Sequence, residues 1–300
     1  MPDATTFYAT QSVFSSPGDL ARLYADLPPD PAGLARIVRN LMIHRWEGGL
    51  FGYDLPEDRL RDDAETRYVD GILAIIAGRD GSSLTRRRDP DRRFVGVCRD
   101  FALLHCSFLR HAGIPARVRS GFATYFRPEG FHHDHMIGEH WDGEHGWRLS
   151  DPQLTDPAVY PPMDFDPMDV PRDRFLTAGT AWRLLRAGEA DAATFGLYRP
   201  DLSMSRENFV AGNVLLDIAA VNKAETLVWD VWGAIADIDD GITDADRELY
   251  DRIAEVTAGD GDLEAARTLF LSDHRLRPPA TILSLAPYNG QHQVTLRPPP

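Results

Sequence analysis

The chain has 300 residues, 43% of them hydrophobic, and a formal net charge of -14 because 46 acidic residues outnumber 32 lysines and arginines. This apolar content can fill a substantial core in one elaborated domain or two. The negative charge disfavours contact with phosphate backbones, so we expect no nucleic-acid partner. No apolar run reaches the roughly 20 residues that cross a bilayer, and the first residues lack a signal-peptide pattern. We therefore expect a cytoplasmic protein without membrane contact.

Helical patterns dominate the first 80 residues. Apolar spacings of three and four predict helices over residues 18–27, from Pro31 to the Gly48-Gly49 pair, and over 63–77. A basic loop over residues 79–93 follows and contains Arg86, Arg87 and Arg88. Such a charge run is usually a solvated segment. The alternative is that these arginines receive a carboxylate or phosphate of a substrate, because the loop ends close to Cys98.

A cysteine stands at the expected start of the next helix. The apolar spacing predicts a helix that begins at Cys98 and ends before Gly113 and Pro115. The positive end of a helix dipole favours an anion, so a nucleophilic thiolate is plausible there. The alternative is a small buried apolar residue, which we expect for Cys106 in the body of the helix. Two cysteines on one helix make a poor disulfide framework.

After a strand predicted over residues 116–126, the sequence indicates a β-hairpin. We take Asp142-Gly143-Glu144 as its three-residue loop. This register pairs Trp141 with His145, Glu139 with Trp147, Ile137 with Leu149, and His135 with Asp151. Directly opposed Cβ atoms lie about 4.5–5.5 Å apart, so the Asp151 carboxylate can accept a hydrogen bond from the His135 imidazole. A change of one residue in the loop would turn one partner to the other face.

A zinc site is the other interpretation of the histidines in this hairpin. The potential ligands are His132, His133, His140, His145, Glu139 and Glu144. However, the chain has no HExxH spacing here and no cysteine pair beside these residues. We expect most of the histidines to face solvent, and we expect neither a metal nor another cofactor.

Cys98, His135 and Asp151 occur in an order that resembles the transglutaminase-like, papain-related superfamily, including bacterial transglutaminase-like domain proteins. The resemblance covers roughly residues 60–155. Its motifs are Gly96-Val97-Cys98, the run from Gly113 to Arg117, and the segment from His135 through Glu139 and Gly146-Trp147 to Asp151-Pro152.

The resemblance implies an α+β core in which the helix that bears the nucleophile packs on an antiparallel sheet. It also implies that Cys98 is the nucleophile, His135 the base and Asp151 the orienting group. Many members carry tryptophan where this chain has Arg99 and Ile137. We name Arg99 and Trp141, with Arg86, Arg87 and Arg88, as candidate substrate contacts, and the backbone amide of Cys98 as a candidate oxyanion donor.

The chemistry expected from such a triad is acyl transfer through a thioester. Hydrolysis of an amide or peptide bond is our first hypothesis. The alternatives are an aminoacyl or acyl transferase of a small-molecule pathway and a binding module that keeps the fold without turnover. The expected partners are a peptide or small acyl or amide substrate, with a carrier-bound acyl group or an amine acceptor for the transferase.

The second half is predicted to be mainly helical. We divide the chain into a catalytic core with N-terminal helices over 1–155, a Pro/Asp-rich connection over 156–174, and a helical extension over 175–300 that packs on the core and ends in a short hairpin. The expected helices span 175–187, 207–221, 226–235, 243–258 and 262–271. Asp217 and Asp230 are expected to pair with Arg183 or Arg186, or to line a pocket.

Overall fold

The computed structural model describes residues 3–126, 130–199, 202–236 and 241–298. Its first half contains α1 (Ala4–Tyr8), α2 (Pro31–Leu41), β1 (Met42–His44), α3 (Glu57–Asp62), α4 (Val69–Arg79), β2 (Phe94–Gly96), α5 (Cys98–His111), β3 (Ala116–Ala123), β4 (His132–Asp142) and β5 (Gly146–Ser150). A 3-10 helix replaces the α-helix expected near residue 18 and spans Gly18–Tyr24.

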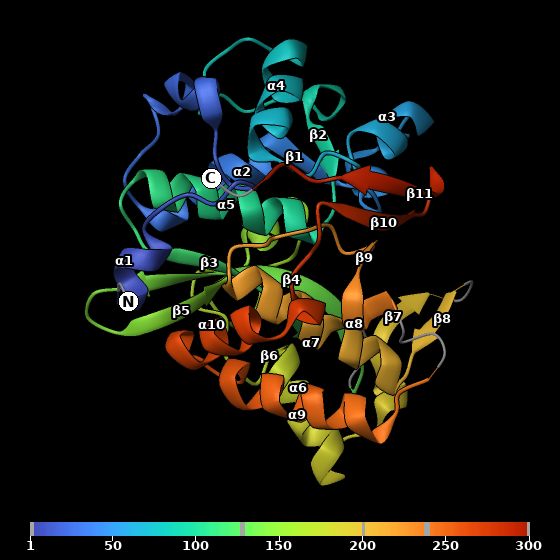
Figure 1. The fold of residues 1–300 in the computed structure, drawn as a ribbon. Helices are drawn as coiled ribbons and strands as arrows, with labels where there is room; N and C mark the ends of the chain where they lie inside the picture. Colours follow the sequence, from blue (N-terminus) through green and yellow to red (C-terminus); the bar gives the residue numbers. More distant parts are fainter. Residues whose placement is uncertain (1–2, 127–129, 200–201, 237–240, 299–300) are drawn as a thin grey trace.

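The second half adds strands as well as helices. Its elements are β6 (Phe175–Thr177), α6 (Ala178–Ala187), β7 (Phe195–Arg199), β8 (Leu202–Ser205), α7 (Glu207–Val221), β9 (Asp230–Val231), α8 (Gly233–Ala236), α9 (Asp244–Thr257), α10 (Leu263–Ser272), β10 (Thr281–Ala286) and β11 (Gly290–Thr295). In Figure 1, α2, α4 and α5 lie in the upper part of the view, and α6, α7, α9 and α10 lie in the lower part.

The central sheet has the strand order β6-β3-β4-β7-β8, and β5 pairs with β4. β3 runs antiparallel along β4 from Ala116↔His140 to Ala123↔His133. The other edge of β4 is shared: β5 pairs with residues 138–142 and β7 with residues 132–133. Neither strand pairs with residues 134–137, so the backbone that carries His135 lies between them.

Helix α5 packs on β3 and β4. Its residues from Cys98 to Arg110 are all buried, the polar as well as the apolar ones, so the helix is covered on every side. The helix ends before Gly113, whose φ of 77° is the left-handed conformation that glycine adopts without strain. At the other end, a Cβ atom on Gly96 would lie 2.8 Å from Asp100 Oδ2, so only glycine fits there. The predicted α+β class, with a cysteine-bearing helix on antiparallel strands, is confirmed.

The predicted helix over 226–235 is wrong. The Asp230 carboxylate accepts a hydrogen bond from the Leu227 amide at 3.0 Å and closes a turn, and β9 then pairs with β10. Trp229 and Trp232 are buried beside this turn, which is why their spacing resembled a helix face. The helix expected from Pro31 ends at Leu41, because Met42 to His44 pair in parallel with Phe94 to Gly96.

The predicted hairpin register is also wrong, by two residues. β5 pairs with β4 through Glu139↔Leu149 and Trp141↔Trp147. The physical reason is the turn: its left-handed position is Gly146, with φ of 83°, so the loop lies at residues 143–145. Because side chains alternate with a period of two, this shift leaves His135 and Asp151 on the same face.

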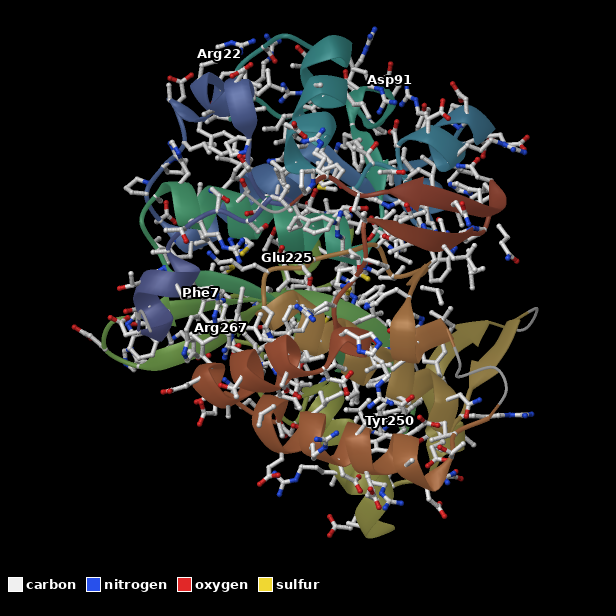
Figure 2. All side chains as sticks on the ribbon, in the orientation of Figure 1. Phe7, Arg22, Asp91, Glu225, Tyr250 and Arg267 are labelled. Carbon is white, nitrogen blue, oxygen red and sulfur yellow. The ribbon has the colours of Figure 1, made fainter. Side chains whose placement is uncertain are left out.

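The two halves are joined by buried charges. Arg99 Nε donates to the Glu225 carbonyl at 3.1 Å, and Arg110 Nη1 lies 3.0 Å from Glu225 Oε1. Figure 2 labels Glu225 in the middle of the molecule, next to α5.

The partners expected for two buried aspartates were wrong. Asp217 accepts from Arg119, and Asp230 accepts from Arg67, rather than from Arg183 or Arg186. The division at residues 155 and 174 stays a prediction, although β6, β7 and β8 of the second half belong to the central sheet. Within the described ranges, the structure has no helix that is both long and apolar enough for a membrane span.

Candidate active site

His135 and Asp151 meet at the end of the sheet. His135 points from the part of β4 that neither β5 nor β7 covers, and Asp151 follows the last residue of β5. The distance from His135 Nε2 to Asp151 Oδ2 is 2.8 Å. Both side chains are buried, with residue exposures of 3% and 1%. The Asp151 carboxylate therefore fixes the orientation of the imidazole ring in a site with little water.

Cys98 lies next to the same imidazole. It is the first residue of α5, it is a free thiol, and it retains 8% of its exposure. Its side chain is close enough to His135 to raise the pKa of the imidazole. Asp151 occupies Nε2 of the same ring. The arrangement places a sulfur, an imidazole and a carboxylate in sequence.

The charge on His135 is set by these two neighbours. Burial alone would lower the pKa of His135, but the Asp151 carboxylate and Cys98 outweigh it and raise this pKa to about 10. The imidazole is therefore protonated at neutral pH. An imidazolium beside a cysteine provides the positive charge that favours a thiolate.

Tyr125 is a partner of Asp151 that the sequence analysis missed. Its hydroxyl donates to Asp151 Oδ2 at 2.8 Å, so this oxygen accepts from both Tyr125 and His135. Burial and the Asp151 charge raise the pKa of Tyr125 well above its usual value, which keeps the phenol protonated as a donor. Tyr125 lies two residues beyond the end of β3, whose residue Gly121 pairs with His135. The strand predicted over 116–126 would have placed Tyr125 on the same face as His135.

A second carboxylate, Glu47, holds the segment after Asp151. Gln153 donates its backbone amide to Asp151 Oδ1 at 3.0 Å and its side-chain amide to Glu47 Oε1 at 2.7 Å. The same Glu47 oxygen accepts from the Tyr160 hydroxyl at 2.5 Å. Arg39 Nη1 lies 2.7 Å from Glu47 Oε2. No local pattern could have revealed this network, because its members are far apart in the sequence.

A second buried histidine lies near the site. His44 ends β1 beside Gly96, and its Nδ1 accepts from the Trp46 amide at 3.2 Å. Burial lowers the pKa of His44 to about 3, and the His135 charge acts in the same direction. His44 is therefore neutral at neutral pH, whereas His135 is protonated.

Most candidate substrate contacts are placed elsewhere. Arg99 is fully buried and binds the carbonyls of Arg67 and Glu225, so the expectation that it contacts substrate is wrong. Trp141 lies six residues from His135 along β4, about 20 Å away, and packs against Trp147.

The basic loop divides into two kinds of arginine. Arg88 is buried and donates to carbonyls of its own loop, at 3.1 Å to Asp80 and 3.0 Å to Ser82. It therefore holds the loop together instead of facing a substrate. Arg86 and Arg87 are exposed, and Arg87 lies 3.4 Å from Asp156. The solvated interpretation thus fits Arg86 and Arg87 but not Arg88.

The histidines of the hairpin do not gather around a common point. In the part of the chain that the structure describes, no group of three or more His, Cys, Asp or Glu side chains is arranged to hold a metal ion. His132 stacks on Phe195, with ring centroids 4.2 Å apart, and His145 pairs with Asp142.

The comparisons with known proteins agree with this geometry in one segment. No curated protein matches the chain. A solved structure from Cytophaga hutchinsonii, described as a "Putative Cysteine Protease", matches with 16% identity and a TM-score of 0.34, over 52% of this chain and 44% of that one. The match thus spans less than half of the length of that protein.

The family model of the transglutaminase-like superfamily matches residues 81–152. This segment contains β2, α5 and the strands β3, β4 and β5. It also contains Cys98, His135 and Asp151 in the order that the sequence analysis expected. Residues 81–152 of this chain are therefore similar to the core of the transglutaminase-like superfamily.

Proposed function

We propose that the chain is a cysteine-dependent hydrolase of amide or peptide bonds. Cys98 acts as the nucleophile, His135 as the general acid and base, and Asp151 as the group that orients the imidazole. The observation that carries this proposal is the buried pair of His135 and Asp151, 2.8 Å from Nε2 to Oδ2, with Cys98 at the start of α5 close enough to raise the pKa of the same imidazole.

The reaction uses these groups in two steps. The Cys98 sulfur attacks the carbonyl carbon, a C–S bond forms, and the C–N bond breaks as protonated His135 gives its proton to the leaving nitrogen. Water then attacks the thioester, gives a proton to His135, and releases the acid and the thiolate. The backbone amide of Cys98, at the N-terminus of α5, is the proposed donor to the oxyanion.

Acyl transfer to an amine is the alternative outcome of the same intermediate. The amine replaces water in the second step, so the two activities share Cys98, His135 and Asp151. A binding module that keeps the fold would instead show an inert thiol.

The decisive experiment is alkylation with iodoacetamide between pH 4 and pH 10, with mass spectrometry to locate the adduct. We expect Cys98 to react preferentially, and faster at pH 6 than a free thiol, whose rate rises up to about pH 8.5. Cys106 is the internal control, because it is completely buried and burial raises its pKa to about 12.

A His135→Gln variant sharpens the result. Removing the imidazolium should move the rise in Cys98 alkylation to higher pH. If Cys98 instead reacts at the rate of an ordinary thiol in both proteins, both enzyme hypotheses are wrong and the binding module remains.

A further inference from the structure

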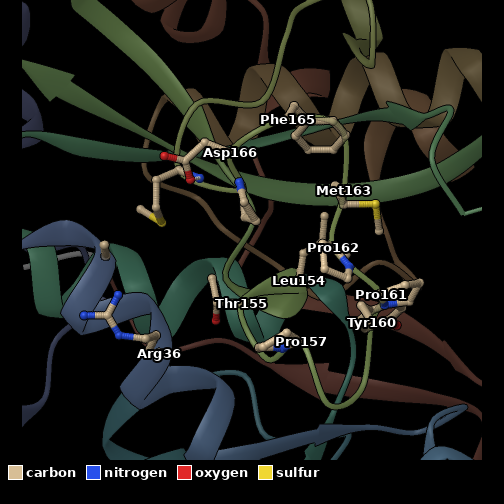
Figure 3. A pocket seen from close by; sticks show the side chains of 13 residues that line it. Arg36, Leu154, Thr155, Pro157, Tyr160, Pro161, Pro162, Met163, Phe165 and Asp166 are labelled. Atoms are coloured by element: carbon tan, nitrogen blue, oxygen red, sulfur yellow. Dashed lines mark hydrogen bonds between the residues drawn. The ribbon is translucent and has the colours of Figure 1, made fainter.

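A pocket lies beside Asp151 and is built largely by the Pro/Asp-rich connection. Its volume is about 290 Å³ and thirteen residues line it, ten of them apolar. Figure 3 shows Phe165, Met163 and Tyr160 on one side and Arg36 on the other. The size suits one large side chain with part of its backbone, because small-molecule pockets begin at about 300 Å³.

Three separate contacts attach the walls of this pocket to Asp151. The Asp151 amide donates to the Pro167 carbonyl at 2.7 Å. The Phe165 ring packs against Tyr125, with centroids 5.3 Å apart, and Tyr125 donates to Asp151. Tyr160 accepts from Gln153 at 3.1 Å, and the Gln153 amide donates to Asp151. The pocket and the carboxylate are thus parts of one packed unit.

The pocket lies on a definite side of the reacting sulfur. His135 meets Asp151 through Nε2, and the pocket walls contact Asp151, so the pocket lies on the carboxylate side of the imidazole. A general acid must stand next to the leaving nitrogen to protonate it. The pocket is therefore on the leaving-group side of the scissile bond.

The distance can be bounded from the chain. Leu154 lines the pocket and is three residues from Asp151, which is at most about 10 Å of extended chain. A substrate must cover this distance and also the span from Cys98 to Asp151. We infer that this pocket is a specificity subsite for an aromatic or large aliphatic side chain of a peptide substrate, on the leaving-group side of the scissile bond.

The lining fits a peptide segment better than a simple hydrocarbon. Met163, Phe165 and Leu154 offer apolar contacts to a side chain, while the exposed charges of Arg36 and Asp166 stand where backbone amide and carbonyl groups would pass. This inference rests on the proposed function, because it names the substrate class of that same thioester chemistry.

The test measures the attack of a peptide amine on the acyl-enzyme, which is the reverse of the step in which the leaving group departs. p-Nitrophenyl acetate acetylates Cys98 of the full-length protein, and a peptide amine then attacks the thioester carbon, so that a C–N bond forms, the C–S bond breaks and the amine gives a proton to His135. The acceptors are Gly-Phe, Gly-Gly-Phe and Gly-Gly-Gly-Phe amides, each with its alanine counterpart. We expect the Phe acceptor of the best length to yield about tenfold or more acetyl-peptide than its Ala counterpart.

Two variants fill the pocket from opposite walls. Met163→Trp and Ala32→Leu should each reduce this preference for Phe towards unity. The matched control is Leu271→Trp, which adds an indole at a residue of α10 that is 50% exposed. It should keep the preference of the wild-type protein.

The outcomes separate this inference from the proposed function. Acetylation at Cys98 with equal yields from Phe and Ala acceptors overturns the subsite and leaves the proposed function standing. If Cys98 is not acetylated, the proposed function fails. The pocket is then judged by the binding of acetyl-Gly-Gly-Phe amide, measured by calorimetry in the wild-type and Met163→Trp proteins. Equal or undetectable binding overturns the inference.

Discussion

Two buried polar clusters lie on the same strand, four residues apart, and differ in what their members can do. Around His135, the neighbours are a thiol, a phenol and a carboxylate. Around Glu139, they are guanidinium groups: Arg117 Nε lies 2.6 Å and Arg119 Nη1 3.1 Å from Glu139 Oε2. Both clusters are almost inaccessible to solvent.

The difference lies in protonation. Burial alone would raise the pKa of Glu139, but Arg117 and Arg119 hold it at about 2, so this cluster keeps its charges at any ordinary pH. It also binds Asp217 of α7 through Arg119, which connects the sheet to the helices of the second half. The His135 cluster consists of groups that exchange protons. The comparison indicates that the Glu139 cluster stabilises the fold, and it agrees with our proposal that the His135 cluster performs chemistry.

The strongest way to break this comparison is to remove the sulfur. Cys98→Ala should lower the hydrolysis of p-nitrophenyl acetate by about 10⁴-fold, because the other groups of a triad contribute little once the nucleophile is absent. The release of p-nitrophenol measures the rate. Cys106→Ala is the matched control on the same helix, and it should retain activity in whatever fraction of the protein is folded.

Breaking the other cluster should instead affect stability. Asp217→Asn removes one of the two carboxylates that pair with Arg119, at 2.9 Å, and leaves only Glu139 at 3.1 Å. The loss of one partner of a buried ion pair costs about 3–5 kcal/mol. Urea unfolding measures this loss, while the alkylation rate of Cys98 in the folded variant should stay unchanged.

The control for Asp217→Asn is an exposed pair of the same kind. Asp251→Asn removes the carboxylate that Arg186 approaches to 3.0 Å, with both side chains more than 40% exposed. We expect Asp251→Asn to lower the free energy of unfolding by less than about 1 kcal/mol. If Asp217→Asn were equally mild, the Glu139 cluster would not hold the two halves together as the comparison assumes.

A subtler change tests how Asp151 is held. Tyr125→Phe removes one of the two donors to Asp151 Oδ2 and leaves the ring in place. The carboxylate should then interact more strongly with His135 and raise its pKa further, because a hydrogen bond to a carboxylate competes for its charge. We expect kcat/KM to fall about tenfold and the basic limb of its pH profile to move upward.

Tyr160→Phe is the matched control for this prediction. Like Tyr125, Tyr160 donates from a partly buried phenol to a carboxylate, at 2.5 Å, but its partner is Glu47 rather than Asp151. Tyr160→Phe should lower the free energy of unfolding without moving the basic limb of the pH profile of kcat/KM. An equal shift in both variants would mean that Tyr125 has only a structural role.

The sequence predicted the parts of the site that depend on local patterns. The regular apolar spacing predicted that helix α5 begins at Cys98, and Gly113 predicted where the helix ends. The pairing of His135 with Asp151 was expected from a register that is wrong by two residues, and it was still found because the period of a strand is also two. The catalytic roles of these residues stay a prediction.

The remaining parts depend on contacts between distant segments. Arg99 was expected to meet substrate, but the carbonyl that binds it belongs to Glu225, 126 residues away. Tyr160 is 113 residues from Glu47, so no local spacing reveals their hydrogen bond. Proline-rich composition predicted a connection over 156–174 but gave no reason to expect that it would form a pocket.

A change of stability with pH is the last expected effect. The pKa of His135 rises from its ordinary value of 6.5 to about 10 in the folded protein, so folding favours the protonated imidazole. This contribution is complete below pH 6.5 and is lost as the pH rises towards 10. His135→Gln should therefore differ most from the wild-type protein at pH 6 and least at pH 10, as measured by urea unfolding under reducing conditions.

The Glu139 cluster supplies the reference for this measurement. Glu139, with its pKa of about 2, and the arginines that surround it keep their charges across the same range. The stability lost in Asp217→Asn should thus be similar at pH 6 and at pH 10. If the loss of unfolding free energy in Asp217→Asn also became smaller as the pH rose, both clusters would titrate in this range. The distinction between the two clusters would then be wrong. A constant difference for His135→Gln would mean that the Asp151 carboxylate does not hold a proton on the imidazole.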